Sequence, residues 1–215
     1  MESIEDIRQY SPTEEKINII SHAAGLTLSI VGLLFLVTKA ISHGDVRHIV
    51  SFSIFGISLL ILYAASTFYH SAKKLELRKR LKIIDHASIY ILIAGTYAPF
   101  TLVTLKGTLG WWIFGISWSL ASIGIILKLF FTGRYNFIST LMYVLMGWVI
   151  IFAIKPLLNI LPFEGFLWVL AGGISYTIGA ILYGIKKIKF NHAIFHMFVL
   201  AGSFCHFMSV YFYVI

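Results

Sequence analysis

Residues 111–131 read WWIFGISWSLASIGIILKLFF, an apolar stretch in which Lys128 is the only charged residue. At 1.5 Å per residue, a helix of this length extends about 30 Å, which matches the hydrocarbon core of a bilayer. Within lipid, every backbone polar group must be satisfied inside the protein, and a helix does so within one segment. The stretch therefore predicts a membrane-spanning helix.

Six further stretches of the same kind divide the rest of the chain. The full set lies at residues 17–41, 49–70, 83–105, 111–131, 137–158, 166–185 and 193–215. Hydrophobic residues make up 59% of the chain and charged residues 12%, against roughly 25% charged in an ordinary globular protein, so apolar surface must face lipid. The expected fold class is an all-α membrane protein with a seven-transmembrane helix bundle. We expect a short N-terminal tail, residues 1–16, and a single transmembrane domain, residues 17–215.

Lysine and arginine are distributed unevenly between the two sides of this expected bundle. Of 17 such residues, the poorer side holds only four, which leaves 13 on the side of the N-terminal tail; the four are Lys39, Arg47, Lys106 and Lys155. The positive-inside rule places the richer side in the cytoplasm. We therefore expect a multi-pass protein of the cell (inner) membrane, with the N-terminus inside and the C-terminus outside. The net charge of +8 then reflects orientation and contact with anionic membrane lipids, and not nucleic-acid binding.

Several polar residues lie at one depth in the expected spans, near the cytoplasmic side. They come from helices far apart in the sequence and are Ser66, His70, Asp85, His86, His192 and His196. Ionisable groups inside a membrane are costly, and they are functional candidates by default. Their shared depth therefore predicts a functional site.

The His192-x-x-x-His196 pair carries the clearest local signal. On a helix the two imidazoles point the same way about 6 Å apart along the axis, close enough to share a zinc ion. His70 lies at the matching depth as a third ligand, and three neutral imidazoles with one water form a shell typical of catalytic zinc. The alternative is that the histidines are polar caps at the membrane interface. The presence of Ser66 and Asp85 at the same depth favours a metal, because they can hydrogen-bond around it.

Three short motifs carry a resemblance to a known family. They are Glu15-x-x-Asn18-x-x-Ser21-His22-x-x-Gly25, then Ser66-x-x-x-His70 followed by Asp85-His86, and His192-x-x-x-His196 with a later His206. In this order and spacing, over nearly the whole chain, they resemble the hemolysin III family of bacterial membrane proteins. That family lies within the broader progestin and adipoQ receptor family, which includes the adiponectin receptors.

The resemblance implies a seven-helix bundle with an inside N-terminus and a zinc ion near the cytoplasmic face. The ligands it implies are His70, His192 and His196, with Ser66 and Asp85 beside the metal and its water. The N-terminal tail is shorter than the long N-terminal regions of the animal receptors, which argues against a hormone-receptor role.

The leading hypothesis is zinc-dependent hydrolysis of a membrane lipid at the cytoplasmic leaflet, with a ceramide-like amide as substrate. That substrate follows from the resemblance to adiponectin receptors and from their relationship to alkaline ceramidases. Asp85 is expected to act as the base and Ser66 to donate to the developing oxyanion. The alternatives are a non-enzymatic sensor or regulator of membrane lipid state with structural zinc, and a pore-forming hemolysin. The expected partners are membrane lipids, with a lipid or fatty acid as the ligand.

The remaining polar residues are expected to have structural roles. Glu15, Asn18 and His22 can orient the site or cap the first helix, and capping or packing is preferred. His86 is expected to be an interface or packing residue. His206, about 15 Å along its helix from the histidine pair, is expected to form a buried hydrogen bond.

Two cationic features are interpreted by their position near the ends of spans. Lys128 is expected to extend its ammonium group to the inner surface. The run from Lys73 to Lys82 is expected to be a solvated loop that sets orientation.

Overall fold

A computed structural model of the chain describes residues 10–132 and 136–214, and of Asn136 only the backbone. Within these ranges the regular elements are helical, and seven spans are long and apolar enough to cross a membrane. The expected fold class, an all-α bundle of seven transmembrane helices, is confirmed.

Five of the spans are built around one uninterrupted helix each, and these helices are α2 (Pro12–His43), α3 (Val46–Ser71), α5 (Gly107–Phe131), α8 (Phe163–Gly184) and α9 (Asn191–Tyr213). The third span combines α4 (Leu75–Pro99) with a π-helical turn, η1 (Phe100–Thr104). The fifth span combines α6 (Asn136–Gly147), a 3-10 turn, η2 (Val149–Ala153), and α7 (Ile154–Ile160).

The first helix begins earlier than the sequence analysis predicted. Ser11 caps α2, because its hydroxyl oxygen accepts a hydrogen bond from the backbone N–H of Glu14 at 3.2 Å. Pro12 follows in the first turn, where a missing N–H costs nothing. Residues 12–16, assigned to the N-terminal tail, are therefore helical, and Glu14 and Glu15 lie on a helix of the bundle.

The third span, predicted at residues 83–105, starts earlier than predicted, at Leu75, and ends close to the predicted position, at Thr104. Helix α4 begins at Leu75, so most of the run from Lys73 to Lys82 is helical and not a loop. At Pro99 the α-helix gives way to the π-helical turn η1, because proline removes one N–H donor and crowds the preceding turn.

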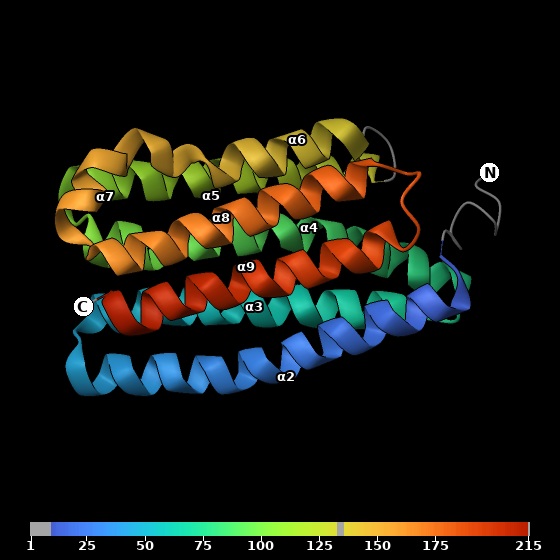
Figure 1. Cartoon of the computed structure of the whole chain (residues 1–215), viewed down its shortest axis with the longest axis horizontal. Coiled ribbons are helices and arrows are strands. Elements are labelled where there is room, and N and C mark those ends of the chain that lie inside the picture. Colours follow the sequence, from blue (N-terminus) through green and yellow to red (C-terminus); the bar gives the residue numbers. More distant parts are fainter. Residues whose placement is uncertain (1–9, 133–135, 215) are drawn as a thin grey trace.

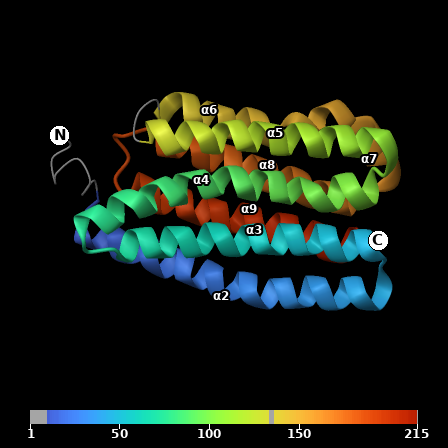
Figure 2. The ribbon, with the colours of Figure 1, turned by 180° about the vertical axis from the view of Figure 1, so that it is seen from behind.

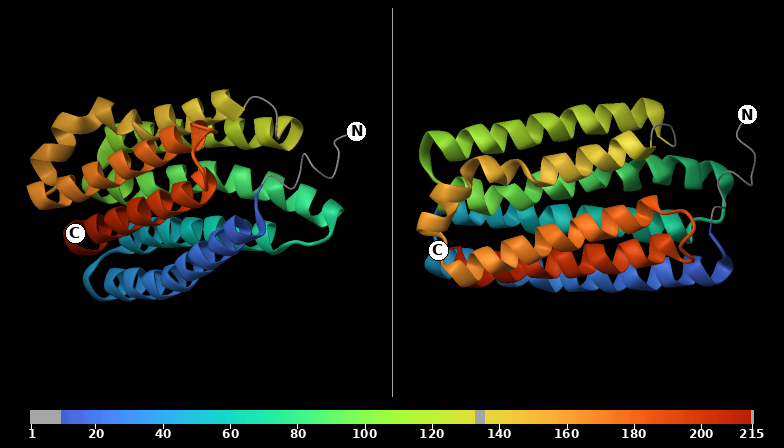
Figure 3. Two further views of the ribbon diagram at one scale, coloured as in Figure 1. Left: turned by 45° about the vertical axis from the view of Figure 1, so that its right-hand side comes forward. Right: turned by 45° about the horizontal axis from the view of Figure 1, so that its top comes forward.

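Helix α4 lies inside the bundle, as Figure 2 shows by its place between α3 and α5. Over the most apolar 18 residues of the third span, which α4 forms with η1, 78% of the residues are buried, against 11% over the corresponding 18 residues of the fifth span. Helix α2 lies at one edge against α3 and α9, and α6 lies at the opposite side against α5 and α8 (Figures 1 and 3). Large apolar side chains cover the outer faces, as contact with lipid requires.

The helices alternate in direction, so that α2 begins and α9 ends at opposite ends of the bundle (Figure 1). We call the end where α2, α4 and α9 begin and α3 ends the histidine end, because it holds His70 and His192. Close packing of α2 on α3 near this end depends on Gly25. A Cβ atom there would lie 2.7 Å from the ring of Tyr63, so only glycine permits this approach.

Candidate metal centre

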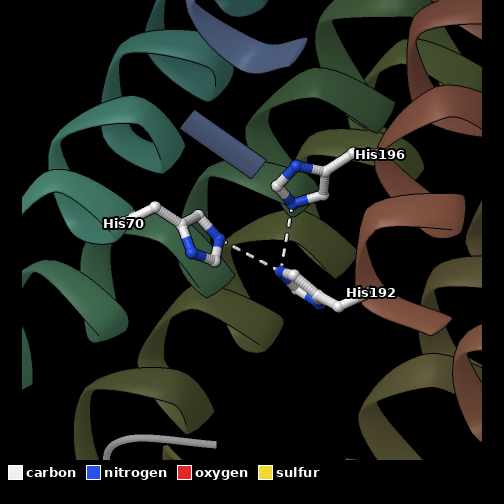
Figure 4. A group of neighbouring side chains, drawn as sticks. All are labelled: His70, His192 and His196. Atoms are coloured by element: carbon white, nitrogen blue, oxygen red, sulfur yellow. Dashed lines mark hydrogen bonds between the residues drawn. The ribbon is translucent and has the colours of Figure 1, made fainter. Parts of the chain in front are cut away.

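Three histidine side chains from two helices meet at the histidine end. His70 lies in the last turn of α3, and His192 and His196 lie one turn apart at the start of α9. Figure 4 shows the three rings pointing toward one another: Nε2 of His192 is 3.1 Å from Nε2 of His70 and 3.0 Å from Nε2 of His196. All three side chains are buried. The fold thus brings together the three residues predicted as metal ligands, and this group could hold a metal ion.

The two separations that involve Nε2 of His192 fit a tetrahedral ion. Zinc–nitrogen bonds of about 2.0–2.1 Å at tetrahedral angles place two ligand nitrogens about 3.3 Å apart. The observed separations of 3.0 and 3.1 Å are only slightly shorter. A neutral imidazole nitrogen carries either one proton or one lone pair, so Nε2 of His192 cannot form good hydrogen bonds with both neighbours. A cation between the rings removes that conflict, because each ring then offers it a lone pair.

Glu15 orients the first of these histidines. Its Oε2 accepts a hydrogen bond from Nδ1 of His70 at 2.7 Å, and its Oε1 forms an ion pair with Arg78. With its proton on Nδ1, His70 keeps a lone pair on Nε2, the nitrogen that faces the other two rings. Of the two roles considered for Glu15, orienting the site describes this contact, which the preferred capping or packing role does not include. Arg78, which is buried on α4, was missed because the surrounding basic run shows no sign of which residue faces inward.

Ring contacts hold the other two histidines. His22 stacks on His196 with ring centroids 3.5 Å apart and planes within 11°, so the packing role preferred for His22 is observed. The hydroxyl of Ser21 lies 3.4 Å from Nδ1 of His196. Tyr10 stacks on His192 with centroids 4.6 Å apart, and burial raises the pKa of its phenol, which therefore stays neutral. No sequence motif indicates a role for Tyr10.

Ser66 and Asp85 lie beside the histidines but outside the ligand group. Both are buried, one on α3 and one on α4, and both line a cavity that also reaches His192 and His196. In the described part of the chain, the group of atoms close enough to share an ion consists of nitrogens of the three histidines. It does not include a carboxylate oxygen of Asp85. The hydroxyl of Ser66 forms no hydrogen bond of normal geometry with another described residue, although Ser66 interacts with the carboxyl group of Asp85.

This cavity is long and largely apolar. Its volume is about 180 Å³, and it extends between α4, α6, α8 and α9 from His192 and His196 to Phe100 and Leu157. Along α4 the lining runs from Asp85 to Phe100, a distance of about 22 Å at the α-helical rise. A space with polar groups at one end and apolar walls beyond them suits an acyl chain with a polar head.

His206 lies deeper along the cavity, away from the three histidines. It is buried and stacks on Tyr176 with ring centroids 5.4 Å apart. Its Nδ1 has no hydrogen-bond partner among residues 10–132 and 136–214. The ring of His206 therefore stacks on Tyr176, and its Nδ1 does not form the expected buried hydrogen bond with a described residue.

Lys128 also differs from expectation. It lies on the face of α5 that packs into the bundle, one turn beyond Gly124, and it is 3% exposed and lines the cavity. The prediction that it extends to the surface is wrong. Hydropathy places a lysine near a helix end, but the rotation of α5 about its axis decides whether the side chain points outward or inward.

The fold and the histidine cluster together define an integral membrane protein of seven helical spans with a buried site able to hold a metal. The family model described as "Haemolysin-III related" matches residues 10–207, so the chain belongs to the haemolysin-III related family and is a multi-pass membrane protein.

Relatives agree with this assignment over nearly their whole length. The chain is 49% identical over 202 residues to "Hemolysin-3" of Bacillus cereus, covering 94% of this chain and 92% of that protein. It is 50% identical over 200 residues to "Hemolysin-3 homolog" of Bacillus subtilis (strain 168), covering 93% and 94%. It is 28% identical over 213 residues to "Monocyte to macrophage differentiation factor" of Homo sapiens, covering 95% and 87%.

Proposed function

We propose that this protein is a zinc-dependent hydrolase of membrane lipids, with a ceramide-like amide as its substrate class. The observation that carries the proposal is the continuity of the histidine cluster with the apolar cavity. Groups able to hold a metal lie at one end of a space shaped for an acyl chain. The lysine and arginine distribution supports a cytoplasmic position for this end of the bundle.

His70, His192 and His196 would hold the ion through their Nε2 atoms, which face one another. When bound, zinc supplies Lewis acidity toward a carbonyl oxygen or a water molecule. The number of ligands supports chemistry, because structural zinc sites usually have four protein ligands and catalytic sites three.

The remaining residues of the site have separate tasks in the proposed reaction. Asp85 accepts a proton from water as the water oxygen bonds to the amide carbon, and the proton passes to the amide nitrogen as the C–N bond breaks. The products are a fatty acid and an amine. Ser66 donates a hydrogen bond to the carbonyl oxygen as it gains negative charge, a contact worth ~3–4 kcal/mol when preorganised. Glu15 holds His70 in one tautomer, and Tyr10 shields His192 from water.

A non-enzymatic sensor of membrane lipid state with structural zinc is the second candidate. The observation that favours it is the enclosure of the site, since all three ligands are buried and Tyr10 covers one of them. In this case the cavity would bind a lipid without turnover, and Asp85 would respond to the bound metal without transferring a proton.

Hydrolysis by the reconstituted protein separates the two candidates. Purified protein is incubated with a panel of ceramides and phospholipids, with and without chelator, and products are measured by mass spectrometry. The variants are Asp85→Asn and Ser66→Ala, with Asp45→Asn and Ser117→Ala as controls, because Asp45 lies in the loop before α3 and Ser117 is buried on α5 outside the cavity lining. The proposal expects zinc-dependent product that both site variants lose and both controls keep.

No turnover across the panel in folded, zinc-loaded protein would favour the sensor. The names of two relatives refer to haemolysis, so release of haemoglobin from red cells is measured in parallel. Lysis without lipid products would support the pore-forming alternative.

A further inference from the structure

Lys128 is buried, and no described residue forms an ion pair with it. In the described part of the chain, the ion pairs are those of Asp45, Glu15 and Glu76, and none includes Lys128. Its ammonium group also forms no cation–π contact or hydrogen bond with a described residue, since only its backbone carbonyl oxygen is engaged, by Thr132. A buried ammonium without a counter-ion is unfavourable, and a bound anion would compensate it.

Two side chains of α4 can contribute to an anion site beside Lys128: the ammonium group of Lys82 and the imidazole of His86, which can donate an N–H. Lys82 and His86 are one turn apart on one face of that helix, and each interacts electrostatically with Lys128. Nδ1 of His86 is buried and has no hydrogen-bond partner among the residues described. Among the described residues, no ion pair joins Asp85 to Lys82 or Lys128, and Asp85 interacts instead with His70 and Ser66.

The same cavity connects this basic cluster with the histidines. Lys128 and His86 line it at the histidine end, together with His192 and His196. An anion at Lys128 would therefore sit at the polar end of a molecule whose chain occupies the apolar part of the cavity.

We propose that Lys128, with Lys82 and His86, forms an anion-binding subsite for the phosphate or carboxylate group of an acyl lipid held in the cavity. This inference adds a binding site for the polar group of the lipid to the proposed hydrolase. It rests on the proposed function in one respect, namely that the lipid is the substrate or product of the neighbouring site. The shared chemistry is an anionic oxygen group attached to an acyl chain. The phosphate of an intact lipid and the carboxylate of a released fatty acid both supply it.

Binding is tested without relying on hydrolysis. The thermal-unfolding midpoint of the full-length protein in detergent is measured as purified and after chelation, while it is titrated with palmitate, phosphatidic acid, neutral diacylglycerol or inorganic phosphate. Palmitate or phosphatidic acid should raise the midpoint saturably, because a ligand that binds only the folded state stabilises it. Diacylglycerol and inorganic phosphate should do so at least tenfold less effectively. Preference between the two anionic lipids identifies the carboxylate or the phosphate as the natural group.

Charge variants assign this binding to the subsite. Lys128→Gln should weaken binding of the anionic lipid at least tenfold, and Lys128→Arg should keep it within about threefold, because arginine retains the charge. Lys187→Gln is the control, since Lys187 is an exposed lysine in the connection before α9. If Lys128→Gln does not fold, the double change Lys82→Gln with His86→Gln replaces it and should also weaken binding.

Several outcomes would overturn the proposal. Equal shifts of the unfolding midpoint by neutral and anionic lipids would contradict an anion site. Unchanged binding of the anionic lipid in the folded charge variants would contradict it as well. Inorganic phosphate as effective as a lipid would mean that the cluster binds free anions without an acyl chain. Anionic-lipid binding that depends on Lys128 in protein that shows no hydrolysis would leave the subsite standing and contradict only the hydrolase function.

Discussion

Nδ1 of His70 donates a hydrogen bond to Oε2 of Glu15 at 2.7 Å, although 55 residues separate them in the sequence. The same carboxylate pairs with Arg78, so one acidic side chain connects α2, α3 and α4 beside the three histidines. The contact gives His70 a defined tautomer and ring orientation, and this is how carboxylates commonly support metal-binding histidines.

Glu15→Gln should therefore weaken zinc binding. Loss of a carboxylate behind a ligating histidine typically costs 10–100-fold in metal affinity. Affinity is measured by competition with a chelator on detergent-purified protein. Glu76→Gln serves as the control, because Glu76 is exposed and its ion pair among the described residues is with Lys79 on the surface of α4. Equal affinities in the two variants would contradict the orienting role.

The pair His192→Ala and His196→Ala should abolish stoichiometric zinc binding, since two of three ligand nitrogens are removed. Metal content is measured by mass spectrometry on protein whose folding is checked by its thermal transition. His206→Ala is the control, because His206 is a buried histidine of the same helix that lies outside the ligand group. One zinc per chain in the folded double variant would show that the metal binds elsewhere.

The chain should cross the membrane with its C-terminus outside. The prediction rests on the excess of lysine and arginine on the side of the N-terminal tail. Alkaline phosphatase fused after Ile215 in a bacterial host should be active, and a cytoplasmic reporter at the same point should be inactive. The reverse pattern would invert the assignment and place the histidine end at the outer leaflet.

Asp45 should stabilise the start of α3 in a pH-dependent way. Its Oδ1 accepts hydrogen bonds from the backbone of Arg47 and His48 and from Nδ1 of His48, and chiefly this side-chain contact lowers its pKa from the usual 3.8 to about 2. Because the pKa is lower in the folded protein, the stabilisation is present above about pH 4 and is lost as the pH falls toward 2.

The measurement is the difference in unfolding midpoint between the natural chain and Asp45→Ala. That difference should be constant well above pH 4 and shrink below it. Asp45→Asn provides the matched control, because asparagine also caps helices but does not titrate, so its advantage over alanine should not follow the same curve. A difference that grows on acidification would rule out this role of the carboxylate.

The sequence by itself determined the seven spans and the histidine pair on α9. Both are local properties: an apolar run long enough to cross lipid must be helical, and residues four apart on a helix share a face. His70 could be added from its depth alone, because the order and length of the spans determine the depth of each residue.

Only the tertiary structure decided which side chains face one another. Glu15 contacts His70, Tyr10 covers His192, and Lys128 turns into the cavity, although sequence patterns suggested capping for Glu15 and surface exposure for Lys128. The physical reason is that lipid and protein interior are similarly apolar, so hydropathy along a spanning helix does not reveal its rotation about its axis. That rotation is determined by packing against neighbouring helices, many of which are far apart in the chain.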